Sequence, residues 1–144
     1  MSRDKGHWEG VANPNEYYGF IYLIRNNVSG QQYIGRKFYH MYKKRKPVKE
    51  SNWKTYTGSC KPLNEDIKEL GKSKFSFIIL TNYKTRGGVV SGEVQFQNDN
   101  DVLIKFLPDG NRAFYNGQTG SVKFIPKESL SRLQRDRISK RKIV

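Results

Sequence analysis

The chain has 144 residues, of which 27 are Lys or Arg and 13 are Asp or Glu, so its formal net charge is +14 and its isoelectric point is about 9.9. This length fits one domain, and so large a positive charge favours a polyanionic partner, nucleic acid first of all. An internal disulfide and a zinc cluster are excluded, because the chain has one cysteine, Cys60, and two histidines, His7 and His40. The lack of a long apolar run or an apolar signal core predicts a cytoplasmic protein that makes no membrane contact.

Residues 1–16 carry Gly, Asn, Pro and charged side chains without apolar periodicity, and they predict a loose N-terminal arm. Residues 18–25 are rich in aromatic and β-branched side chains, and a short segment with Asn26 and Gly30 separates them from a second such run at 31–35. This order of strand, turn and strand predicts a β-hairpin.

The segment 36–49 holds seven basic residues and no acidic residue, with aromatic residues between them. A helix is expected up to Lys46, because Pro47 disfavours a helical conformation in the residue before it. Basic residues interleaved with aromatic rings are typical of segments that contact nucleic acid.

Helical spacing of apolar residues returns at 62–70, where Pro62 suits a first turn and Gly71 a C-terminal stop. Residues 75–80 predict a third strand that is buried on both faces, and residues 89–102 predict a further helix. Short extended pieces are expected at 103–107, 114–117 and 122–125, and a basic terminal helix at 127–141.

The hairpin carries two tripeptides, Phe-Ile-Tyr at 20–22 and Tyr-Ile-Gly at 33–35. They resemble the signature of the GIY-YIG nuclease superfamily, with Phe20 in place of the first glycine. Residues 53–59, with the helix and strand that follow, look like the small phage-type members of this family. Those members carry a glutamate on a later helix and an asparagine near the end of the domain, and Glu93 and Asn116 match these positions.

The resemblance covers about residues 17–117, which implies a nuclease domain over this range and a basic C-terminal extension at 118–144. It implies an α/β (α+β) fold, with a small three-stranded, mostly antiparallel sheet flanked by helices. It also implies a metal-dependent DNA endonuclease that hydrolyses phosphodiester bonds by water attack and leaves 5′-phosphate and 3′-hydroxyl ends. Double-stranded DNA is the expected substrate, and a phage gene expressed in a bacterial host is the expected origin.

Glu93 is the expected metal ligand. A divalent cation activates water and neutralises phosphoryl oxygens, and Mg²⁺ is often held by one or two carboxylates together with phosphate and water. One glutamate therefore suffices for Mg²⁺, or for Mn²⁺ in its place. The alternative for Glu93 is a solvated acid on a helix face.

Tyr22 and Tyr33 lie on neighbouring strands, where a suitable register places both side chains on one face. A phenol has a pKa of about 10, so it acts as a base at neutral pH only if cations or a metal lower that pKa. Arg36, Lys37 and Arg45 are the cations expected to do so. By resemblance, one tyrosine orients or deprotonates the attacking water and the other contacts phosphate, with Tyr22 expected as the base. Both are otherwise ordinary strand aromatics.

Members of the family carry an arginine on the helix after the second strand, often followed four residues later by His or Tyr. Arg36 and His40 have that spacing and would share a helix face, whereas Arg45 better fits the usual distance from the glycine of the second tripeptide. Both arginines stay candidates, and Lys37 beside them would add charge on a phosphate. The alternative is that the whole segment only follows the DNA backbone.

Further contacts are expected with the nucleic-acid backbone. Asn116 would position phosphate, or serve as a turn residue, because Asn-Gly is a common turn dipeptide. Ser59 lies before the helix at 62–70, whose N-terminal amides suit a phosphate, and a helix cap is its alternative role. The expected DNA-binding side chains are Lys43, Lys44, Lys46, Lys54, Tyr56, Ser59, Arg132 and Arg135.

Two other classes of function compete with the nuclease. A non-catalytic nucleic-acid-binding module on the same scaffold is favoured by the mismatch at Phe20, by Gly92 inside the helix expected at 89–102 and by the undecided arginine. A ribosome-associated protein would bind structured RNA rather than DNA. Restriction enzymes of the family can dimerise to cut both strands, so a homodimer is left open.

Overall fold

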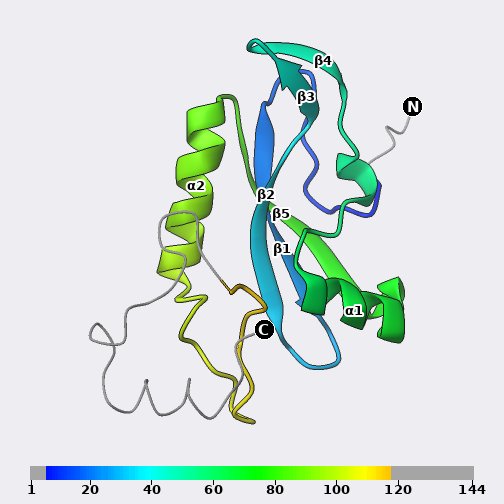
Figure 1. Cartoon of the computed structure of the whole chain (residues 1–144), viewed down its shortest axis with the longest axis vertical. Helices are drawn as coiled ribbons and strands as arrows, with labels where there is room; N and C mark the ends of the chain where they lie inside the picture. Colours follow the sequence, from blue (N-terminus) through cyan, green and yellow to red (C-terminus); the bar gives the residue numbers. More distant parts are fainter. Residues whose placement is uncertain (1–5, 118–144) are drawn as a thin grey trace.

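A computed structural model describes residues 6–117 and shows an α+β fold built on a three-stranded sheet (Figure 1). The strand order is β2-β1-β5, and both pairings are antiparallel. Strand β1 spans Gly19–Asn26, β2 spans Gln32–Phe38 and β5 spans Phe75–Tyr83. The predicted hairpin and the expected fold class are therefore confirmed, with β2 at one edge of the sheet.

Both faces of the sheet are covered, because β1 in the middle is apolar on both sides. Phe20, Tyr22 and Ile24 belong to one buried cluster, and Ile21 belongs to a second cluster on the opposite face. Helix α1 (Lys61–Leu70) and the short 3₁₀ turn η1 (Trp53–Thr55) contribute to the first cluster, and α2 (Arg86–Asp99) contributes to the second. Figure 1 shows α1 and α2 on opposite sides of the sheet.

The helix expected over residues 36–46 is wrong, because this segment is a β-hairpin. Strand β2 continues to Phe38, and β3 (His40–Lys43) then pairs with β4 (Lys46–Glu50). The aromatic residues repeat every second position at Phe38, His40 and Tyr42, which is the period of a strand, and Tyr39 between them is fully buried. Burial of Tyr39 stabilises the extended chain, and Pro47 is tolerated at the start of β4.

The N-terminal segment from residue 6 onward differs from the loose arm expected for residues 1–16. Trp8 is only 3% exposed, and its ring Nε1 donates a hydrogen bond to the carbonyl of Trp53 at 2.5 Å. Glu9 forms a parallel β-bridge with Ile78 on the outer side of β5. A single large apolar ring therefore holds against the sheet a segment whose composition is otherwise typical of a loop.

The remaining elements follow the sequence with small changes at their ends. Helix α1 has Pro62 in its first turn, and its C-cap, Gly71, has a φ of 93°. Strand β5 alternates between buried and partly buried residues, so the expectation that residues 75–80 are buried on both faces is wrong. Helix α2 begins at Arg86, three residues earlier than expected, and a 3₁₀ turn, η2 (Lys72–Lys74), precedes β5.

The end of the described chain crosses the outer edge of β2. Phe114 forms a parallel bridge with Gln32, and Phe106 bridges Arg112, which corresponds to the short extended pieces expected near 103–117. The pieces expected at 122–125 and 127–141 lie outside the described residues. Within residues 6–117, no helix is long and apolar enough to cross a membrane.

Candidate active site

The site forms at Gly35, in the middle of the edge strand β2. Tyr22 is paired with Gly35 across the hairpin, and its phenol lies over the bare Cα of that glycine. A methyl group on Gly35 would overlap with the phenol oxygen and with Cζ of Tyr22, which would lie 2.6 Å away. Gly58 also lies close to this phenol, because a methyl group on Gly58 would lie 3.2 Å from the same oxygen. Two glycines thus leave room for the phenol group of Tyr22.

Three tyrosines meet around this position. The ring centroid of Tyr22 is 6.1 Å from that of Tyr33 and 6.2 Å from that of Tyr56. The sequence predicted that Tyr22 and Tyr33 share a face, and the structure brings them together. Tyr56, expected only as a DNA contact, belongs to the same cluster.

The tyrosines have raised pKa values, contrary to the expectation that neighbouring cations lower them. Burial raises the pKa of Tyr22 well above its usual value, and the acidic groups of Tyr33, Tyr56 and Glu93 raise it further. Burial also raises the pKa of Tyr33 to about 12, although a hydrogen bond with Ser59 opposes this. Both phenols therefore carry their protons at neutral pH and are hydrogen-bond donors in the free protein.

Glu93 reaches the site from α2. The helix begins at Thr85, whose side chain accepts a hydrogen bond from the backbone N–H of Gly88 at 3.0 Å. Val89, Glu93 and Gln97 recur every four residues and face the sheet. Val89 and Gln97 are buried, which places the Glu93 carboxylate between them with its side chain 15% exposed.

Arg36 is the arginine that contacts Glu93. Its guanidinium Nη1 lies 3.4 Å from Oε1 of Glu93, and its side chain is 37% exposed. Burial raises the pKa of the Glu93 carboxyl, and the positive charge of Arg36 opposes this rise. The charge of Glu93 also acts on Tyr22 and Tyr33, so the carboxylate lies within electrostatic reach of both phenols around the edge of β2.

Lys37 points to the other face of β2, as successive residues of a strand do. Its Nζ lies 4.1 Å from the centroid of the Tyr56 ring, and burial lowers its pKa. Lys37 and Arg36 therefore place positive charge on both sides of the edge strand, with Gly35 directly before them in the sequence.

Asn116 is held by the backbone of β2 through both polar atoms of its side chain. Its Oδ1 accepts a hydrogen bond from the Ile34 N–H at 3.1 Å, and its Nδ2 donates to the Ile34 carbonyl at 2.8 Å. Gln97 donates to the same carbonyl at 3.0 Å, and Asn116 is 2% exposed. Asn116 thus pairs with the outer edge of β2 as a further strand would, next to Gly35.

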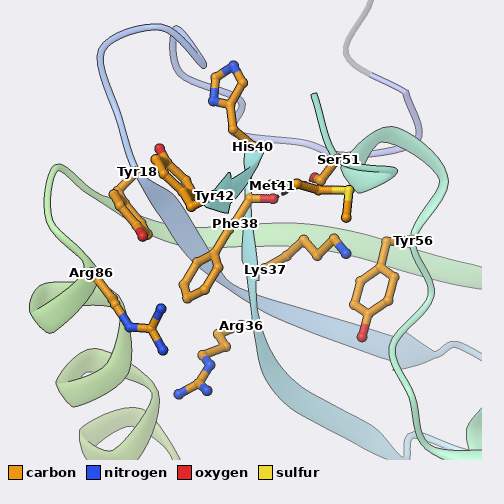
Figure 2. Close-up of a pocket in the computed structure, with 10 residues that line it drawn as sticks. All are labelled: Tyr18, Arg36, Lys37, Phe38, His40, Met41, Tyr42, Ser51, Tyr56 and Arg86. Atoms are coloured by element: carbon orange, nitrogen blue, oxygen red, sulfur yellow. Dashed lines mark hydrogen bonds between the residues drawn. The ribbon is translucent and has the colours of Figure 1, made fainter. Parts of the chain in front are cut away.

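An open pocket of about 390 Å³ lies beside Arg36, between β2, the β3–β4 hairpin and the start of α2 (Figure 2). Arg86 lines it, and its guanidinium carbon lies 5.6 Å from the centroid of the Phe38 ring. The guanidinium carbon of Arg36 lies 5.9 Å from the same centroid. Neither Arg86 nor Phe38 was expected in the site. Arg86 could have been predicted from its position seven residues before Glu93, because this spacing places both side chains on the same face of a helix.

His40 and Arg45 lie on the β3–β4 hairpin and not on the expected helix, so their positions differ from those predicted. His40 lines the same pocket from β3, so the helical spacing proposed for Arg36 and His40 is wrong although both reach one cavity. Arg45 lies in the turn between β3 and β4 and lines a neighbouring hollow of about 560 Å³ with Lys44 and Arg86. The structure thus places Arg36, and not Arg45, in contact with Glu93.

The other expected DNA-binding residues are spread around the site. Lys43 and Lys46 are exposed on the β3–β4 hairpin, whereas Lys54 forms an ion pair with Glu50 at 3.7 Å. Ser59 bonds Tyr33 and does not cap α1, whose N-cap is Cys60. Arg132 and Arg135 lie outside the described residues.

The chain's own donor atoms fit a hard divalent cation held at one carboxylate. Between residues 6 and 117 there is no group of three or more His, Cys, Asp or Glu side chains that could enclose a metal ion. Glu93 offers a partly exposed carboxylate in contact with Arg36, which lines an open cationic pocket. Oxygen donors of this kind suit Mg²⁺ or Mn²⁺, which retain water and take further oxygen ligands from a phosphate.

Comparison with known proteins gives one assignment. Residues 5–119, four-fifths of the chain, match the family model described as "Putative endonuclease segE, GIY-YIG domain". Neither the curated proteins nor the solved structures yield a significant match.

Proposed function

Because this chain belongs to the GIY-YIG endonuclease family, we propose that it is a metal-dependent DNA endonuclease, which cleaves by water attack and leaves 5′-phosphate and 3′-hydroxyl ends. The observation that carries the proposal is the pairing of Arg36 with Glu93 around the edge of β2, within electrostatic reach of Tyr22 and Tyr33. A carboxylate, a guanidinium and two phenols at one strand edge supply the groups that phosphodiester hydrolysis requires.

Glu93 would hold the Mg²⁺ or Mn²⁺ ion, and its partial burial on the face of α2 that packs on the sheet fixes the carboxylate in place. When bound, the ion supplies Lewis-acid neutralisation of the phosphate and activation of water. Arg36, which is more exposed than Glu93, neutralises the charge that develops on the phosphoryl oxygens. Lys37 contributes positive charge from the other face of β2.

Tyr22 and Tyr33 act as hydrogen-bond donors rather than as bases in this proposal. Their raised pKa values keep both phenols protonated near neutral pH. Tyr22, held close to Gly35 and Gly58, orients the attacking water, and Tyr33 contacts the phosphate. Asn116 and Gln97 keep the strand edge rigid through the backbone of Ile34.

Double-stranded DNA is the proposed substrate, and its backbone would follow the cations around the site. The positive surface extends along the β3–β4 hairpin through Lys43, Lys44, Arg45 and Lys46. Each cation that neutralises a phosphate releases counterions, so DNA affinity should fall steeply as salt is added.

The test is the Glu93→Ala variant. Supercoiled plasmid is incubated with the protein in Mg²⁺, in Mn²⁺ and in EDTA, and binding to a short duplex is measured in EDTA. The variant should lose cleavage by more than about 100-fold and should bind the duplex as the wild type does. Glu65→Ala, which removes an exposed carboxylate from α1, is the matched control and should cleave normally.

Undiminished cleavage by Glu93→Ala in Mg²⁺ would contradict the site. Plasmid that the wild type binds but leaves uncut in all three conditions would point to the non-catalytic module instead. Tight binding of structured RNA without binding of DNA would point to a ribosome-associated protein.

A further inference from the structure

The pocket beside Arg36 and the hollow beside Arg45 share part of their lining. Tyr18, Tyr42 and Arg86 line both spaces, which measure about 390 and 560 Å³. Among the described residues that line them there is no Asp or Glu, whereas Arg and Lys side chains come from β2, from the β3–β4 turn and from the start of α2. Both spaces are therefore cationic, and a ligand that fills either of them carries negative charge.

The walls of the pocket beside Arg36 are aromatic as well as cationic. Tyr18 and Tyr42 are stacked, with ring centroids 4.3 Å apart and an angle of 9° between the planes. Tyr18 also meets Phe38 edge to face at 5.0 Å. The guanidinium groups of Arg36 and Arg86 approach the Phe38 ring, so rings and charges form one continuous surface (Figure 2).

Backbone phosphates of a regular duplex require only the cations. A pocket of about 390 Å³ is large enough for a small organic ligand, and aromatic walls favour a flat group that stacks. A nucleotide whose base has left the helical stack combines both features, because its base stacks on rings or guanidinium planes while its phosphate binds arginine.

We propose that this pocket binds one unstacked nucleotide of the DNA, with its base against Tyr42 and its phosphate at Arg36 and Arg86. The proposal rests on the proposed nuclease function, since it defines the substrate of that site. Arg36 contacts Glu93 and also lines the pocket. The unstacked nucleotide therefore lies next to the phosphate that is cleaved, and DNA that contains an unpaired nucleotide is the preferred substrate.

Binding is measured in EDTA, so that the result is independent of cleavage. Two short duplexes share one strand that contains 2-aminopurine: in one duplex it is paired with thymine, and in the other the complementary strand lacks that thymine, so the 2-aminopurine is unpaired. The two duplexes compete for the protein in a fluorescence anisotropy assay. The wild type should prefer the unpaired nucleotide by about tenfold, which is at the low end of what one base–ring stack supplies. The 2-aminopurine fluorescence should change on binding.

Variants separate the roles of ring and charge. Tyr42→Leu should remove the preference while the fully paired duplex is still bound, and Tyr42→Phe, which keeps the ring, should retain it. Arg86→Ala should weaken binding of both duplexes more than Arg25→Ala, which removes an exposed arginine from the far end of β1. Circular dichroism verifies that each variant is folded.

Equal affinity of the wild type for the two duplexes would overturn the proposal, as would a preference that survives in Tyr42→Leu. Failure of the nuclease function itself would be seen separately, as plasmid that the wild type leaves uncut in Mg²⁺.

Discussion

At the scale of single residues, the site depends on the missing side chain of Gly35. The ring of Tyr22 comes from the central strand and crosses the edge strand only because nothing projects from Gly35. Phe20, which occupies the first position of the other tripeptide, is completely buried against Trp8, Tyr39 and Trp53. The mismatch at Phe20 therefore affects the core, whereas a change at Gly35 would affect the site.

Gly35→Ala should reduce cleavage by more than about tenfold, because the added methyl group displaces the phenol of Tyr22. The displacement should also lower the free energy of unfolding by about 1–3 kcal/mol. Plasmid cleavage and urea denaturation measure the two effects. A variant with normal cleavage would show that the position of the Tyr22 phenol does not matter for catalysis.

At the scale of elements, the β3–β4 hairpin turns through two residues, Lys44 and Arg45. Both have positive φ, 51° and 67°. A two-residue turn of this type is normally built from Asn-Gly, because side chains beyond Cβ make positive φ unfavourable. The turn therefore places two positive charges in the lining of the hollow beside Arg45, and the strained backbone of these two residues lowers the stability of the fold.

Replacing Lys44 and Arg45 together by Asn-Gly should therefore raise the free energy of unfolding by about 1–2 kcal/mol. The same change should weaken DNA binding and reduce the slope of log affinity against log salt by up to about 2, if both cations neutralise phosphates. Urea denaturation and a salt titration of duplex binding measure these effects. An unchanged salt slope would exclude the turn from the DNA interface.

Helix α2 contains Gly92, which the sequence marked as unfavourable for a helix. The ring of Tyr83, the last residue of β5, packs directly on this glycine, and an added methyl group would lie 2.6 Å from the Tyr83 hydroxyl oxygen. Gly92 thus lets α2 approach the sheet closely enough for Glu93 to reach the edge of β2. Gly92 is therefore compatible with the proposed site and does not favour the non-catalytic module.

Gly92→Ala should lower the free energy of unfolding by about 1–3 kcal/mol through overpacking. Gly87→Ala is the matched control on the same helix, because its added methyl group would have no atom within 4 Å beyond its chain neighbours and the backbone of its own helix. It should raise the free energy of unfolding by about 0.4–1 kcal/mol. Equal effects of the two substitutions in urea denaturation would show that Tyr83 moves away from the added methyl group without a loss of folding free energy.

At the scale of the whole molecule, the N-terminal segment completes the core on the face opposite α2. His7 stacks on Phe77 with ring centroids 3.9 Å apart, and its Nε2 lies 2.9 Å from the carbonyl oxygen of Tyr56. Burial lowers the pKa of His7 to about 4, and the positive charge of Lys72 lowers it further, against the effect of the Tyr56 carbonyl. The segment therefore links stability to pH.

The direction of this pH dependence follows from the protons that His7 binds in the folded and unfolded chains. The unfolded chain takes up a proton on His7 near pH 6.5, whereas the folded chain does so only near pH 4. The free energy of unfolding should thus be unaffected by His7 above pH 6.5 and should fall as the pH is lowered from 6.5 to 4. The slope is below about 1.4 kcal/mol per pH unit, because the ring is partly exposed.

The His7→Gln variant should lack this dependence, so the difference in unfolding free energy between variant and wild type should change between pH 6.5 and 4. Urea denaturation at a series of pH values measures it. A constant difference over that range would contradict the low pKa of His7.

Local patterns in the sequence determined much of this protein. Runs rich in aromatic and β-branched residues, separated by a short segment with Asn26 and Gly30, predicted β1, β2 and their turn, and Pro62 with Gly71 predicted α1. The two tripeptides pointed to the family, which the match over residues 5–119 confirms. These features are local, because each depends on residues that are neighbours in the chain or pair across one short turn.

Only the tertiary structure decided which distant groups meet. The segment after Arg36 forms a hairpin where a helix was expected, because burial of Tyr39 outweighs the weak helical preference of the basic residues. The tertiary structure brought Arg36 rather than Arg45 to Glu93, tied Asn116 to the backbone of Ile34, and placed Arg86 beside the site. Such contacts join residues far apart in the sequence, and packing of α2 and of the chain end against β2 sets them.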